Sequence, residues 1–133
     1  MDDMTHQLAK NPVHLGLGAT AEVEPAITGM EWYAGYIERH KTDGNEGRLV
    51  AEHTFSEPWD SWEMHPEGSE LVYCIRGEID LIQEVPGTTR RIKLRSGEYA
   101  INEPGVWHTA DVTESCTVLF ITSGLGTQHR QRT

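Results

Sequence analysis

Short stretches in which apolar and polar residues alternate run through the chain from about residue 30 to residue 123. The clearest of them are RLVAEHTF, ELVYCIRGEIDLIQEV, RRIKL, YAIN, WHTADV and CTVLFIT. The segments PEGS, PGTT, RSGE and EPGV separate them, and proline and glycine at such positions are typical of tight turns. This spacing of about eight or nine short strands predicts an all-β sandwich or barrel.

Three further segments complete this pattern. EWYAGYIER is rich in aromatic and branched residues, so we count it among the strands, and HKTDGNEG after it is expected to be a turn or loop. Gly77, in the middle of the longest apolar stretch, predicts a bend or bulge between two strands. The polar, basic end LGTQHRQRT is expected to be solvated, with His129 and Arg130 able to fold back as the alternative.

The first 28 residues differ in texture from the rest of the chain. They hold Pro12, Pro25 and several glycines and alanines without sustained periodicity, which predicts a loosely ordered N-terminal arm over residues 1–28. A short helix over Thr5 to Lys10 is compatible with this arm. Residues 29–133 are expected to form a single β-barrel domain, because a chain of 133 residues is long enough for one core only.

The composition of the chain indicates which classes of binding partner and which cellular location to expect. A net charge of −10 argues against nucleic acid and against an anionic membrane surface. The sequence has no apolar run of about 18 residues and no secretory signal, so we expect a cytoplasmic protein. Cys74 and Cys116 lie in apolar strand-like runs and are expected to be buried free thiols in a reducing compartment.

Ionisable residues interrupt the apolar stretch WEMHPEGSELVY. Side chains alternate along a strand, so Glu63 and His65 share a face, and after the PEGS turn Glu70 can lie across from His65. The stretch SGEYAINEPGVWHT places His108 directly after a second Pro-Gly turn, on a strand that returns to the sheet. Two imidazoles with one or two carboxylates suit a divalent transition metal.

The first of these stretches resembles the first motif of the cupin superfamily. The family motif is His-x-His, three or four residues, Glu, six residues and Gly. Here the order is Glu63-x-His65, four residues, Glu70, six residues and Gly77. The spacing fits, but Glu63 stands where the first histidine is usual.

The second stretch resembles the second cupin motif, which is Gly, five residues, Pro-x-Gly, two residues and His. Here Gly97 is followed by five residues, Glu103-Pro104-Gly105, two residues and His108. Glu103 replaces the first proline of the motif. Val112 stands four residues after the histidine, where the family has asparagine.

The resemblance implies a double-stranded β-helix, or jelly-roll barrel, with a metal in its mouth, and often a dimer. His65, Glu70 and His108 are then the expected metal ligands, with Glu63 as a fourth ligand or a close partner. Glu63 hardens the site, which favours iron or manganese and leaves zinc and nickel open. We therefore predict a homodimer, with EWYAGYI packing or pairing across the partner.

Three functions compete on this barrel. The first is a metal-dependent enzyme, of oxygenase, isomerase or lyase type, acting on a small oxygen-bearing organic molecule. The second is a non-catalytic small-ligand-binding module, and the third is an interaction protein with a vestigial site. For the enzyme, Glu63 is the catalytic candidate, a general base whose pKa is expected to be raised by a low-dielectric pocket.

Other residues are weaker pocket candidates on sequence grounds. His53 is a candidate for the pocket wall, and Arg48 and Arg76 could anchor an anionic substrate. Cys74 shares its face with Glu70, although inert packing is the simpler expectation for it. The aromatic residues could wall the site or serve only in packing: Trp59, Trp62, Tyr73, Tyr99 and Trp107.

Overall fold

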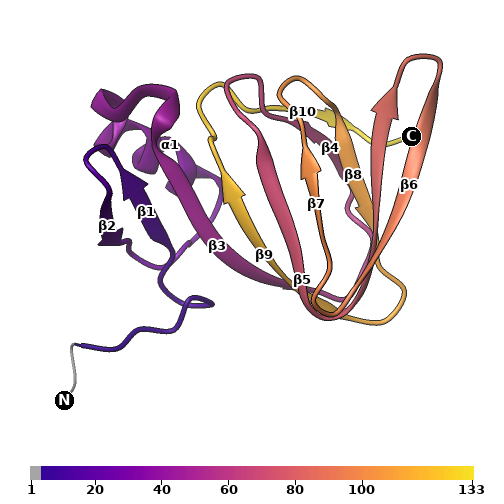
Figure 1. Ribbon diagram of the computed structural model, residues 1–133, viewed down its shortest axis with the longest axis horizontal. Helices are drawn as coiled ribbons and strands as arrows, with labels where there is room; N and C mark the ends of the chain where they lie inside the picture. The colour runs from indigo at the N-terminus through magenta and orange to yellow at the C-terminus, as the bar shows by residue number, and fades with distance from the viewer. Residues whose placement is uncertain (1–3) are drawn as a thin grey trace.

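The computed structural model describes residues 4–133, which form a barrel of antiparallel strands (Figure 1). Helix α1 (Met30–Arg39) and the 3-10 helix η1 (Lys41–Glu46) separate β2 from β3. The strands are β1 (Val13–Gly16), β2 (Thr20–Val23), β3 (Arg48–Phe55), β4 (Ser61–Met64), β5 (Glu70–Val85), β6 (Thr88–Arg95), β7 (Tyr99–Asn102), β8 (His108–Asp111), β9 (Cys116–Thr122) and β10 (Gln128–Gln131). The predicted all-β class is confirmed.

Strand β5 links the two halves of the barrel. Its first part pairs with β7 and β9, and its second part pairs with β6 and β8. The register shifts between Cys74 and Arg76, and Gly77 follows with a φ of 84°. A Cβ on Gly77 would lie 2.3 Å from the carbonyl oxygen of Ser115, so only glycine fits. The predicted bend is confirmed, within one long strand instead of between two.

The main core lies between the two halves of the barrel and is formed mainly by residues of β5, β6, β8 and β9. Both cysteines are free and buried in it, as expected. Cys74 therefore packs in the core and does not line the cavity described below. The buried residues of this core are Val72, Cys74, Ile79, Leu81, Leu94, Ala110, Val112, Cys116, Val118 and Phe120.

The segment EWYAGYIER is helical, so its assignment as a strand was wrong. Aromatic composition favours a strand, but Trp32 and Tyr36 are four residues apart and share one face of a helix. Their rings stack at 5.5 Å and are buried against Leu49 and Ala51 of β3. The loop expected over HKTDGNEG contains η1. The helix covers one end of the barrel (Figure 1).

The expectation of a loosely ordered arm was wrong for residues 13–23. Strands β1 and β2 form a hairpin, and β1 pairs with β3, so the hairpin extends the main sheet. Every residue of β2 is exposed, so no apolar alternation marks it in the sequence. In place of a helix over Thr5 to Lys10, the structure has a turn in which the Lys10 amide donates to the Gln7 carbonyl. Residues 1–3 lie outside the described part.

The polar C-terminal end is not simply solvated, so the alternative in which it folds back is the correct one. Strand β10 pairs with β4, and this register places His129 opposite Glu63.

Within residues 4–133, no helix is long and apolar enough to cross a membrane.

We expect a homodimer, with its interface on the β1–β2 hairpin. Trp32 and Tyr36 are buried within the protomer, so they are not free to meet a partner. Large exposed apolar side chains instead gather near β2, which ends the strand order. They are Leu15, Leu17 and Val23.

Light scattering at tens of micromolar should report a mass twice that of one chain. Replacing Leu17 and Val23 with aspartate should halve that mass, because charge would face the partner. Tyr99→Asp, at an exposed apolar position on β7, is the matched control and should leave the mass unchanged. A monomeric wild-type protein at this concentration would contradict the prediction.

Candidate metal centre

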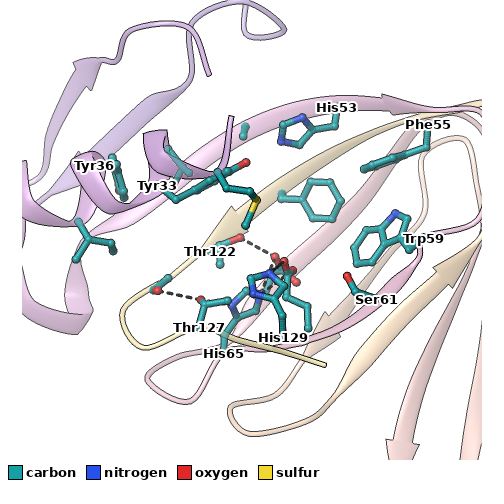
Figure 2. A pocket seen from close by; sticks show the side chains of 18 of the residues that line it. Tyr33, Tyr36, His53, Phe55, Trp59, Ser61, His65, Thr122, Thr127 and His129 are labelled. Atoms are coloured by element: carbon teal, nitrogen blue, oxygen red, sulfur yellow. Dashed lines mark hydrogen bonds and ion pairs between the residues drawn. The ribbon is translucent and has the colours of Figure 1, made fainter. Parts of the chain in front are cut away.

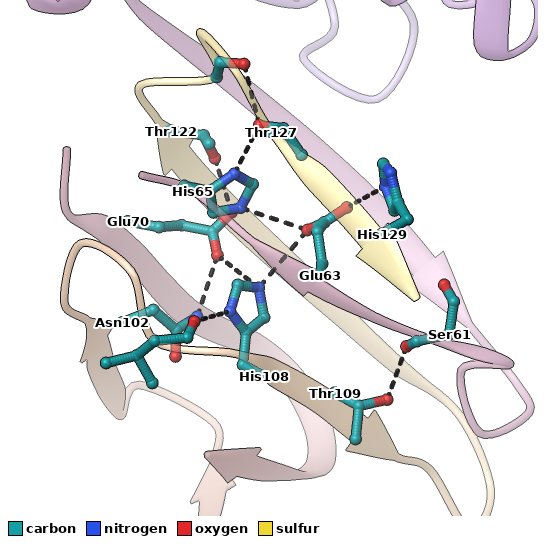
Figure 3. Close-up of polar contacts among 12 residues, drawn as sticks. Ser61, Glu63, His65, Glu70, Asn102, His108, Thr109, Thr122, Thr127 and His129 are labelled. Carbon is teal, nitrogen blue, oxygen red and sulfur yellow. Dashed lines mark hydrogen bonds and ion pairs between the residues drawn. The ribbon is translucent and has the colours of Figure 1, made fainter. Parts of the chain in front are cut away.

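The four residues singled out by the two motifs meet in space (Figure 3). Glu63 lies on β4, His65 directly follows β4, Glu70 begins β5, and His108 begins β8. Strands β4 and β8 pair with Glu63 opposite His108. The second turn is tied to the first by the Gly105 amide, which donates to the His65 carbonyl at 2.9 Å. The spacing argument for this cluster therefore describes the geometry correctly.

The two imidazoles and two carboxylates face one another across a small space. His65 Nε2 lies 3.3 Å from Glu63 Oε1 and 3.3 Å from Glu70 Oε2. His108 Nε2 lies 3.5 Å from Glu63 Oε1 and 3.2 Å from Glu70 Oε1. One ligand atom from each residue lies within 4.8 Å of the other three. This cluster could hold a metal ion.

Hydrogen bonds on the far side of each ring show which nitrogen carries its lone pair toward the centre. The His108 Nδ1–H donates to the Val106 carbonyl at 3.3 Å, since a carbonyl can only accept. The Thr127 hydroxyl donates its one proton to the Gly124 carbonyl, so it must accept from the His65 Nδ1–H at 2.8 Å. In the neutral rings, both Nε2 lone pairs therefore point at the carboxylates.

Both Nε2 atoms are buried and lack an aligned hydrogen-bond partner within the described residues. Orphaned nitrogens of this kind are costly in a folded protein unless a ligand satisfies them. A backbone or side-chain oxygen that fixes Nδ1–H while Nε2 is left free is the usual support of a metal-bound histidine. The residues present thus fit a divalent metal.

Glu70 is held by a chain of hydrogen bonds that begins at the exposed Arg90 and runs inward. The guanidinium of Arg90 donates to Gln83 Oε1 at 2.6 Å, and Gln83 Nε2 donates to Asn102 Oδ1 at 2.8 Å. Asn102 Nδ2 then donates to Glu70 Oε1 at 3.0 Å. A guanidinium can only donate, so it fixes the orientation of both amides. Thr122 donates to Glu70 Oε2, and together these bonds hold Glu70 as a charged acceptor.

Glu63 is placed differently, with one oxygen toward the centre and one toward the open side. Its Oε1 faces both histidines, and its Oε2 lies 3.1 Å from Nε2 of His129 on β10. Sequence reasoning did not assign a role to His129, and pairing of β10 with β4 is what places it there. The sequence pattern that could have predicted strand β10 is weak, because every residue of this strand is exposed and no apolar alternation marks it.

The cluster shifts the pKa values of all four groups. Burial alone would lower the pKa of each histidine, but the facing carboxylates outweigh it and raise the pKa of His65 and of His108 to about 9. Burial alone would raise the pKa of the carboxyls, but the two imidazoles outweigh it and lower the pKa of Glu70 to about 2. They also hold the pKa of Glu63 well below its usual range. The raised pKa expected for Glu63 was therefore wrong, because two imidazoles face it.

These shifts predict opposite pH dependences for the metal-free fold and for metal binding. Raised histidine pKa values stabilise the metal-free fold fully below about pH 6.5, and this stability is lost as the pH rises through about 9. The lowered carboxyl pKa contributes above about pH 4.5 and is lost as the pH falls through about 2. Metal binding needs neutral imidazoles, so affinity should rise with pH over the range in which metal-free stability falls.

Urea unfolding of metal-free protein at about pH 6 and about pH 9, repeated with manganese, measures both trends. The His65→Ala variant with His108→Ala should lose the decline in metal-free stability. Equal metal-free stability of the wild-type protein at the two pH values would contradict the prediction.

A cavity of about 860 Å³ opens beside the cluster, and Glu63, His65 and Glu70 line it (Figure 2). His53, one of the weaker candidates, does line the cavity, but Arg48 and Arg76 do not. Among the aromatic candidates only Trp59 lines it, whereas Trp62 and Trp107 contact the Arg130 guanidinium instead. Helix α1 supplies wall residues that sequence reasoning missed: Met30, Tyr33, Ala34, Tyr36 and Ile37.

A second group of histidines, centred on His14 and His40, has a different role. His14 Nδ1 lies 2.6 Å from the Tyr36 hydroxyl, and His14 Nε2 lies 2.6 Å from Asp43 Oδ2. The rings of His14 and His40 stack at 3.6 Å. Both nitrogens of His14 are thus engaged, and the network fastens α1, a wall of the cavity, to the hairpin.

Comparison with known proteins supports the fold. No family model matches the chain, and no curated protein matches it. A protein with a double-stranded β-helix domain from Klebsiella pneumoniae has a TM-score of 0.53 and 23% identity, over 64% of this chain and 76% of that one. A cupin-2 domain containing protein from Shewanella frigidimarina has a TM-score of 0.49 and 19% identity, over 56% and 69% of the two chains.

Hydroquinone 1,2-dioxygenase from a Sphingomonas species, with 4-hydroxybenzoate bound, has a TM-score of 0.48 and 16% identity, over 56% of this chain and 59% of that one. The similarity to the Klebsiella pneumoniae protein shows that the chain has a double-stranded β-helix fold, which is the fold that the two motifs imply. At these levels of identity the similarity concerns the fold and assigns no activity.

Proposed function

We propose that this protein binds one divalent transition metal ion and acts as a metal-dependent enzyme on a small oxygen-bearing organic molecule. The observation that carries the proposal is the convergence of two buried Nε2 atoms, whose rings are held through Nδ1, on two carboxylates beside a cavity. His65, Glu70, His108 and Glu63 Oε1 would hold the ion. Carboxylate-rich donor sets favour iron or manganese over copper.

The bound ion would supply a Lewis acid for an oxygen of the substrate. The surrounding residues would have separate tasks around this ion. Thr127 and the Val106 carbonyl orient the two imidazoles, and Asn102 orients Glu70. The aromatic residues around the cavity, among them Phe55 and Phe120, would exclude water from the substrate.

Elemental analysis of untagged protein is the first test, followed by oxygen-consumption and substrate-panel assays on the iron-loaded and manganese-loaded forms. We expect one ion per chain and turnover that a chelator removes. Protein that retains no divalent metal after loading would contradict metal binding. Full occupancy without turnover across oxygenase, isomerase and lyase panels would contradict the enzyme.

One observation favours a second candidate, a non-catalytic ligand-binding module. The pKa of Glu63 is held low, so its carboxylate is a weak base, and the site lacks the base that the sequence analysis assigned to it. A module of this kind would bind metal and ligand without converting the ligand. The turnover assays therefore distinguish it from the enzyme.

Glu63 is better placed as a ligand supported by His129 than as a base. Glu63→Gln should weaken metal binding by about 10- to 100-fold without abolishing it, since the other three donors remain. His129→Ala should shift affinity in the same direction, because it frees Glu63 Oε2. Competition with a chromogenic chelator measures both affinities.

Glu57→Gln is the matched control, since Glu57 lines the same cavity but lies outside the cluster. It should leave metal affinity unchanged. Wild-type affinity in Glu63→Gln would remove Glu63 from the ligand set. Full turnover in that variant would also exclude it as a base.

A further inference from the structure

The walls of the cavity differ sharply between their aromatic part and their charged part. Phe55, Trp59 and Phe120 pack together with ring centroids 5.6 to 6.2 Å apart. His53 joins them at 5.9 Å from Phe120. Tyr33 of α1 lines the cavity with them (Figure 2). A planar apolar group would find ring faces and edges to pack against here.

The charged groups that line the cavity are predominantly acidic. Glu57, Asp60, Glu63 and Glu70 contribute carboxylates, whereas within residues 4–133 no lysine or arginine lines it. Burial lowers the pKa of His53, so this ring is neutral at neutral pH. The exposed ring of His129 is engaged by Glu63.

A divalent ion would balance Glu63 and Glu70, but it would leave Glu57 and Asp60 as excess negative charge. An anionic group of the substrate can meet the ion. A second anionic group would have to lie against the apolar walls, where its desolvation is costly, or near the exposed carboxylates of Glu57 and Asp60, which repel it without a cation to offset them. The cavity volume of about 860 Å³ lies toward the upper end of the range for small-molecule sites, about 300 to 1,000 Å³. The cavity can therefore hold a metal-bound ligand that is larger than a short-chain acid.

We propose that this cavity takes a neutral or singly anionic molecule with a planar apolar body of one or two rings, and that it discriminates against a second anionic group. The inference rests on the proposed function for the position of the single anionic or hydroxyl group. Two other parts of the inference, the planar apolar ligand and the discrimination against a second anionic group, depend only on the residues that line the cavity.

Three naphthalene probes and one small acid test the inference: 2-naphthol, 2-naphthoate, 2,6-naphthalenedicarboxylate and lactate. Binding is measured by calorimetry to manganese-loaded and metal-free protein, and metal content is measured separately. On loaded protein, 2-naphthoate should bind at least about tenfold more tightly than the dicarboxylate and than lactate. On metal-free protein, 2-naphthol should still bind, because the walls alone hold its rings.

Charge reversal at the cavity provides a matched pair of variants. Glu57→Lys adds a cation to the lining and should reduce the preference for 2-naphthoate over the dicarboxylate by at least about threefold. Glu114→Lys makes the same charge change at an exposed residue outside the lining and should leave the ratio unchanged.

The outcomes separate this inference from the proposed function. Binding of 2-naphthol by a protein that takes up no metal would support the inference and contradict the proposed metal site. Stoichiometric metal with equal affinity for 2-naphthoate and the dicarboxylate would overturn the inference and leave the metal site standing. Tighter binding of lactate than of 2-naphthoate would also overturn it.

Discussion

Replacing His65 and His108 together with alanine is expected to abolish stoichiometric metal binding, the largest effect of any change in this protein. The two rings supply the nitrogen donors of the cluster, and hydrogen bonds from Nδ1 direct both Nε2 lone pairs inward. Without them, only the carboxylates of Glu63 and Glu70 remain, and a carboxylate pair alone binds transition metals weakly. Plasma mass spectrometry of loaded and dialysed protein measures the loss.

His53→Ala is the control for this experiment, because His53 lines the same cavity outside the cluster and should leave metal content unchanged. The double substitution leaves Glu70 buried without its cationic partners, which costs about 3 to 5 kcal/mol in comparable cases. Circular dichroism must therefore show that the variant is folded. The single variant His108→Gln, which retains the ring volume better, is the second test. Full occupancy in folded double variant would remove both histidines from the ligand set.

The barrel fold and the central cluster of the site could be predicted from the sequence because both depend on local, periodic patterns of residues. Turn residues such as Pro66 and Gly105 set the ends of strands, and alternation sets which side chains share a face. These two rules place Glu63, His65 and Glu70 near one another, and the resemblance to the cupin motifs implies that His108 joins them in one cluster. The bend at Gly77 was predictable for the same reason, since a glycine inside an apolar run marks a close approach of backbone.

Other features depended on contacts that no local signal specifies. Helix α1 was mistaken for a strand because its aromatic composition was weighed above the four-residue spacing of Trp32 and Tyr36. The partners of Glu70 escaped notice because Gln83 and Asn102 are polar residues in separate strands, brought together only by the pairing of β5 with β7 and β8. His129 reaches Glu63 through an exposed strand without apolar alternation.

Glu70→Gln is expected to lower metal affinity by more than about 100-fold, beyond the range for loss of a supporting partner, while the fold is retained. The substitution keeps the shape of a side chain that is 3% exposed. Arg90 and Gln83 force the Asn102 amide to donate toward residue 70, so the oxygen of the new amide must face Asn102. Its NH₂ group must then face Thr122 and His65.

This orientation explains why the loss of metal should be so large. The Thr122 hydroxyl can rotate and accept one proton of the new amide, which keeps the pocket satisfied. The new amide nitrogen lies where Glu70 Oε2 lies now, 3.3 Å from His65 Nε2, and its other proton can occupy the lone pair that would bind the ion. One substitution thus removes a charged ligand and blocks a second. Chelator competition should rank Glu70→Gln well below Glu63→Gln, with thermal unfolding of metal-free Glu70→Gln as the check on folding. Equal affinities in the two variants would show that the hydrogen-bond chain from Arg90 does not control the centre.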